Sequence, residues 1–126
     1  MDLEGFDVVK LVSGRQTLTI SHAGISFSQA AIVRLGKPEY VKVMLNKQKK
    51  QLAIQITNVD DPGKTLFLRR GKKHSAVRWN NGLLKSSLSD LMNWNLKDYT
   101  YKVDGQYITT DKLLLFDLKD ATKNKV

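Results

Sequence analysis

The sequence YVKVMLNKQKKQLAIQI, residues 40–56, predicts the element around which the fold is built. Residues 40–45 and 52–56 alternate apolar and polar side chains, which is the period of a half-buried strand. The polar run over residues 46–51 between them is typical of a turn. We therefore expect an antiparallel hairpin with a lysine-rich tip.

The chain before this hairpin predicts two further strands. Residues 6–12 are rich in valine, and residues 15–20 alternate threonine with leucine or isoleucine. Ser13 and Gly14 lie between them and are typical of a turn. We expect the two strands to pair as a hairpin.

Two short helices are predicted from their end signals and their apolar spacing. The first covers residues 29–35, with Ser28 as its N-cap and Gly36 as its stop. The second begins after Asn80 or Asn81 and is expected to end at residues 93–95. Its apolar residues at helical spacing are Leu84, Leu88, Leu91 and Met92.

The remaining segments complete the predicted fold. Further strands are expected over residues 65–70, 77–79, 99–108 and 113–118. Residues 119–126 are predicted to form a frayed tail. Together these elements predict a single α+β domain over residues 1–126, in which two short helices pack on antiparallel sheet. The order helix, strand, turn, strand occurs twice, over residues 28–56 and 83–118, which indicates a pseudo-repeat of helix-hairpin units.

The composition excludes several classes of protein. The chain has 126 residues, of which 41% are hydrophobic, so it is long enough and apolar enough to bury a core. It has no apolar run of membrane-spanning length and no basic, apolar leader at its N-terminus. Without cysteine it has neither disulfides nor thiolate ligands. We expect a cytoplasmic protein with no cofactor and no metal.

The charge distribution is the strongest indication of function. The net charge is +9, and residues 40–89 carry all of the excess, because they hold only two acidic residues, Asp60 and Asp61. Such asymmetry favours a polyanionic partner. The predicted nucleic-acid-binding residues are Lys47, Lys49, Lys50, Arg69, Arg70, Lys72, Lys73 and Arg78. Phosphate contacts would dominate such binding, and DNA in a regulatory or phage-related role is the first expectation.

Three alternatives stay open beside this interpretation. The basic surface would also suit an acidic protein partner, or it would serve solubility alone. Trp79 follows Arg78 and would stack on unpaired bases, although a core tryptophan is the more frequent case. We expect no enzyme. The remote alternative is a Mg²⁺-dependent nuclease of the PD-(D/E)xK type, because Asp104 precedes a strand that ends in Asp117 and Lys119.

Residues 18–56 resemble the swapped-hairpin domain of AbrB-type regulators and antitoxins. The resemblance rests on the strand Gly24-Ile25-Ser26-Phe27, the short helix ending in Leu35-Gly36, and the hairpin with a charged tip. It implies an interlaced homodimer that binds DNA. The positions at which that family carries its basic contacts hold Ile25, Ile32 and Val33 here. The whole chain also resembles small uncharacterised proteins of Gram-positive bacteria and their prophages.

Overall fold

The computed structural model describes residues 4–5, 14–69 and 76–126. Strands make up 43% of these residues and helices 18%. The first strands are β1 (Thr17–Ser21), β2 (Gly24–Phe27), β3 (Tyr40–Asn46), β4 (Gln51–Thr57) and β5 (Lys64–Leu66). The later ones are β6 (Arg78–Trp79), β7 (Tyr99–Ile108), β8 (Leu113–Asp117) and β9 (Thr122–Lys125). The helices are α1 (Gln29–Arg34), α2 (Gly82–Met92) and the 3-10 turn η1 (Leu118–Asp120).

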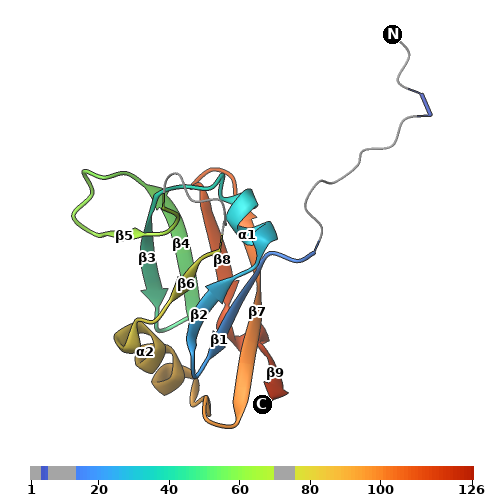
Figure 1. Cartoon of the computed structure of the whole chain (residues 1–126), viewed down its shortest axis with the longest axis vertical. Helices are drawn as coiled ribbons and strands as arrows, with labels where there is room; N and C mark the ends of the chain where they lie inside the picture. Colours follow the sequence, from blue (N-terminus) through green and yellow to red (C-terminus); the bar gives the residue numbers. More distant parts are fainter. Residues whose placement is uncertain (1–3, 6–13, 70–75) are drawn as a thin grey trace.

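The strands form one antiparallel sheet in the order β5-β3-β4-β8-β7-β1-β2-β6, and β9 pairs with the first half of β7. The sheet curls into a half-barrel, so its two edge strands, β5 and β6, approach each other (Figure 1). The indole nitrogen of Trp79 in β6 donates a hydrogen bond to the main-chain oxygen of Leu66 in β5 at 3.1 Å. This bond joins the two edges.

The core fills the inside of the curled sheet. Alternate residues of the five neighbouring strands β4, β8, β7, β1 and β2 point inward and are buried, as the period of two requires. They are Leu18, Ile20, Ile25, Phe27, Leu52, Ile54, Val103, Leu114 and Phe116. Phe27 and Phe116 meet edge to face with their ring centroids 6.3 Å apart, which links β2 to β8 across the interior. The sheet therefore supplies both walls of its own core.

Both helices begin where the sequence predicts and end one residue before the predicted position. The Ser28 side chain accepts a hydrogen bond from the Ala31 N–H at 3.2 Å, and Gly36 after the last turn has a φ of +83°. Asn81 caps α2 in the same way, accepting from the Leu84 N–H at 3.1 Å. In the described ranges no helix is long and apolar enough to cross a membrane.

The expected fold class is wrong. We expected two helices packed on a sheet and a repeated helix-hairpin unit, but the structure is a mostly antiparallel half-barrel, and α2 is the only helix of seven or more residues in the described ranges. The helices also occupy unlike positions, α1 at one end of the sheet and α2 at the other (Figure 1). The physical reason is that the curled sheet buries its apolar face against itself. The helices are then needed only to cover its openings.

Two predictions at the chain ends turn out differently. The tail after β8 is not frayed, because β9 pairs with residues 99–102 of β7 through its main chain although all of its side chains are exposed. The hairpin predicted for residues 6–20 is not formed by β1, whose two edges pair with β2 and β7. The expected strand over residues 6–12 lies outside the described residues.

Candidate functional site

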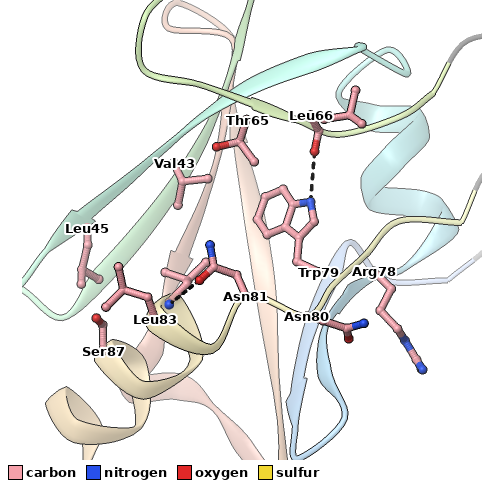
Figure 2. A pocket seen from close by; sticks show the side chains of 11 residues that line it. Val43, Leu45, Thr65, Leu66, Arg78, Trp79, Asn80, Asn81, Leu83 and Ser87 are labelled. Carbon is pink, nitrogen blue, oxygen red and sulfur yellow. Dashed lines mark hydrogen bonds between the residues drawn. The ribbon is translucent and has the colours of Figure 1, made fainter.

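A pocket opens where the curled sheet fails to close. We call this gap between β3 and β5 on one side and β6 and α2 on the other the seam. Its pocket has a volume of about 510 Å³. The eleven lining residues are Val43, Leu45, Thr65, Leu66, Arg78, Trp79, Asn80, Asn81, Leu83, Leu84 and Ser87. Figure 2 shows Val43 and Leu45 on one side of this pocket and the first turns of α2 on the other.

The wall of the pocket at Trp79 is held from several directions. Its ring packs edge to face on Phe27 and Phe67, with centroid distances of 5.1 Å and 6.1 Å. Its indole N–H donates a hydrogen bond to the main-chain oxygen of Leu66 at 3.1 Å (Figure 2). Trp79 thus packs against the core, and a side chain fixed in this way offers a preformed surface to a ligand.

The rim of the pocket is the start of α2. Leu88 is the buried residue of this helix, and the Lys85 ammonium donates to the main-chain oxygen of His22 at 2.9 Å. These contacts fix the helix beside β2 and leave Leu83, in its first turn, 80% exposed. Leu83 therefore adds exposed apolar surface at the mouth of the pocket.

The edge of β3 in the seam is only partly paired. β5 pairs with Tyr40, Val41 and Lys42, so residues 43–46 of β3 meet no described strand on this edge. The main-chain direction follows from the register, because the Phe67 N–H donates to the Glu39 oxygen at 2.7 Å and bonding sides alternate along a strand. Val43 and Leu45 therefore direct main-chain groups into the seam.

The structure distributes the predicted basic residues over several places. Lys47, Lys49 and Lys50 lie in the β3–β4 turn. Arg69 follows β5 and lies beyond the opposite end of β3, roughly 20 Å away at the usual rise per residue. Arg78 belongs to β6, and its guanidinium points away from the pocket (Figure 2). Arg70, Lys72 and Lys73 lie outside the described residues.

The acidic residues of the nuclease alternative each contact a base. Asp104 forms an ion pair with Arg15 at 3.2 Å, and Asp117 contacts the Lys119 ammonium at 3.4 Å. Asp117 also accepts from the Lys119 N–H at 3.1 Å, which begins η1. Within the part of the chain that the structure describes, no group of three or more histidine, cysteine or acidic residues is placed to hold a metal ion.

Among the residues of the pocket, only Arg78 and Trp79 are given a functional role from the sequence. The others were missed because they come from β3, β5 and α2, which the closure of the sheet brings together. One signal was present in the sequence. Leu83 precedes the predicted apolar face of the helix and lies off it, so an exposed leucine at the helix start was foreseeable.

Asp61 fixes the turn that leads into β5. Its carboxylate accepts hydrogen bonds from the Thr57 hydroxyl at 2.7 Å and from the Gly63 N–H at 2.8 Å. The Lys42 ammonium lies 3.0 Å away. These contacts, the Thr57 hydrogen bond first, lower the pKa of Asp61 from 3.8 to about 2. The ionised carboxylate thereby holds β5 against β3, beside the pocket.

We expect Asp61→Asn to lower the thermal midpoint at neutral pH but not at pH 2 and below. The folded-state pKa of about 2 lies below the unfolded value of 3.8, so the stabilisation is complete above the unfolded pKa and is lost as the pH falls through 2. Thermal unfolding of both proteins across this range is the measurement. Asp60→Asn, on the same turn, is the matched control, and a difference that does not depend on pH would contradict the assignment.

Comparison of the chain with protein-family models, with curated proteins and with solved structures found no match. The resemblance to AbrB-type regulators and the homodimer that it implies therefore stay predictions.

Proposed function

We propose that this protein is a non-enzymatic, cytoplasmic module that binds another protein and holds an apolar group of it in the seam pocket. The observation that carries the proposal is the pocket itself, an apolar space of about 510 Å³ between two sheet edges. Its volume falls within the usual range of ligand sites, roughly 300–1,000 Å³.

The chemistry of the lining supports binding rather than catalysis. Its polar side chains are the amides of Asn80 and Asn81 and the hydroxyls of Thr65 and Ser87. The Asn81 oxygen is already used as the cap of α2. Among the lining residues that the structure describes, Arg78 alone is ionisable, and its charged group points away from the pocket. Proton transfer needs a titrating group aimed at the ligand, whereas apolar contact needs only the surface that Leu45, Trp79 and Leu84 provide.

Nucleic acid is the second candidate, and the β3–β4 turn favours it. Lys47 and Lys49 are exposed on this turn, and Lys119 lies against it, donating to the Lys49 main-chain oxygen at 2.7 Å. Several cations on one small surface are the usual footprint of phosphate binding. This site lies beyond the end of β3, so the two candidate functions can be separated by mutation.

We expect the neutral dye N-phenyl-1-naphthylamine to bind in the pocket and Leu83→Glu to weaken this binding about tenfold. The lost apolar contact of a leucine is worth about 1.5–3 kcal/mol when it is fully covered. The change should leave the fold intact, since Leu83 is 80% exposed and a carboxylate suits the first turn of a helix. Dye fluorescence gives the affinity, and NMR shifts of the Trp79 indole N–H and the Leu45 amide locate the site.

The matched control is Val59→Glu. Val59 is 57% exposed but does not line the pocket, so this variant should bind the dye like the parent protein. Dye binding that Leu83→Glu leaves unchanged would contradict the proposal.

Labelled duplex DNA, single-stranded DNA and RNA are tested by anisotropy across a salt series. Tight binding that is lost in a Lys47, Lys49 and Lys50 triple alanine variant, and kept in Leu83→Glu, would favour the second candidate.

A further inference from the structure

We infer that the occupant of the seam is an extended segment of the partner protein, alternating acidic and apolar residues, which adds as a strand to residues 43–46 of β3. This inference rests on the proposed function and deepens it by naming the chemistry of the partner. It follows from three properties of the seam: an open strand edge, an apolar interior and a basic exterior.

The open edge favours a peptide over a compact ligand. Val43 and Leu45 direct main-chain groups into the seam beyond Lys42, the last β3 residue that pairs with β5. Groups on one edge of a strand repeat every two residues, at roughly 7 Å, which is the spacing that another extended chain presents. Such main-chain pairing supplies affinity with little dependence on sequence. Residues 43–46 would pair with four or five residues of the partner.

The interior of the seam selects apolar side chains at alternate positions. Thr65 lies opposite buried Val41, and Trp79 packs on the core, so these two residues mark the inner face of β5 and β6. A strand added beside β3 continues this alternation. Its inward side chains would meet Leu45, Trp79 and Leu84, and the exposed Leu83 would cover them from the rim.

The exterior of the seam selects acidic side chains at the positions between. Lys64 and Arg78 precede the inward-facing Thr65 and Trp79, so they lie on the outer face of the two edges, and both are exposed. None of the described residues that line the pocket is acidic. The outward side chains of an added strand would lie between these two bases. Charge complementarity therefore favours glutamate or aspartate there.

Charge also argues against a second copy of this chain as the occupant. Each copy carries a net charge of +9, and like charges oppose association. Lysine on an edge strand commonly prevents unwanted pairing, and Lys64 fits that role on β5. The part of β3 that meets no described strand is different, because the residues that direct main-chain groups into the seam there are the apolar Val43 and Leu45.

The test uses three synthetic hexapeptides with the full-length protein. The first alternates glutamate with leucine. The second has the same sequence but carries N-methyl groups on the main-chain amides that would face β3. The third alternates lysine with leucine. Fluorescence anisotropy gives the affinities, and the NMR amide signals of Val43 and Leu45 locate the binding. We expect the first peptide to bind, and the other two to bind at least about tenfold more weakly, because two main-chain hydrogen bonds or the charge match are lost.

Two variants test the geometry. Leu83→Glu should weaken the binding of the glutamate-leucine peptide about tenfold, while Val59→Glu should leave its affinity unchanged. The double change Lys64→Glu and Arg78→Glu should reverse the preference between the glutamate and lysine peptides. Both altered residues are exposed, so the fold is expected to persist, and the dye affinity of the double variant checks that the pocket is intact.

Equal affinity of the methylated and unmodified peptides would overturn the inference, and so would unmoved Val43 and Leu45 signals at the solubility limit of the first peptide. If the dye still binds in the pocket, the proposed function survives that failure. If neither dye nor peptide binds there, both fail. A dimer that buries Leu45 and Leu83, or an oligonucleotide that moves the Val43 and Leu45 signals in place of the peptide, would identify a different occupant and also overturn it.

Discussion

Replacing Phe116 with alanine is expected to lower the free energy of unfolding by about 3–5 kcal/mol. Phe116 is fully buried in β8, between Leu52 of β4 and Gly105 of β7. The Phe116 ring lies so close to Gly105 that a Cβ there would stand 2.7 Å from its Cε1 atom. Phe116→Ala would leave a cavity beside β8. Because β8 pairs through its main chain on both sides, the surrounding strands are held in place and do not close on this cavity, so we expect the full loss in the free energy of unfolding. Urea denaturation followed by circular dichroism measures it.

The neighbouring residue provides the control for this prediction. Leu115 points to the other face of β8 and is only half-buried, so Leu115→Ala should cost much less than Phe116→Ala. The loss expected for Phe116→Ala approaches the whole free energy of unfolding of a typical domain, which is about 5–15 kcal/mol. Phe116→Leu, with an expected cost of about 1–2 kcal/mol, keeps the prediction measurable if the alanine variant does not fold. Equal costs at positions 115 and 116 would contradict the assigned inward face of β8.

Replacing Gly24 with alanine is expected to cost about 2–4 kcal/mol and to abolish dye binding in the seam pocket. Gly24 has a φ of +140°, a conformation that residues with a side chain rarely adopt. An added Cβ would stand 2.5 Å from the Trp79 main-chain oxygen and 2.8 Å from the Asn80 side-chain oxygen. Because the first of these is backbone, relief of the clash must move β6 away from β2. Trp79 would then leave the pocket wall.

Gly82→Ala is the matched control for the Gly24 variant. Gly82 opens α2 close to β6, and an added Cβ there meets nothing within 4 Å. Alanine is the better helix former, by as much as about 1 kcal/mol, so Gly82→Ala should keep or raise stability and leave dye affinity unchanged. Urea denaturation and dye titration of both variants are the measurements. Unaltered dye affinity in a folded Gly24→Ala protein would show that β6 does not need its present position to form the pocket.

The basic residues illustrate how far the candidate site could be predicted. Their excess in the middle of the chain is visible in the sequence. Their distribution is not, because the β3–β4 turn and the end of β5 lie at opposite ends of β3. Charge is a property of composition, whereas a surface needs the positions of strands that are far apart in the sequence. The seam pocket was missed for the same reason.

The sequence by itself determined the local elements. Ser28 and Gly36 bound α1, Asn81 begins α2, and the alternating segments became β3, β4, β7 and β8 within a residue or two, because caps, turns and the period of two depend on neighbouring residues alone. The tertiary structure decided the closure. The strand β9, which has no buried side chain, is held by the main chain of β7, and Trp79 reaches Leu66 only after the sheet has curled. Non-local pairing and burial determine both, and a single sequence does not encode them in any local pattern.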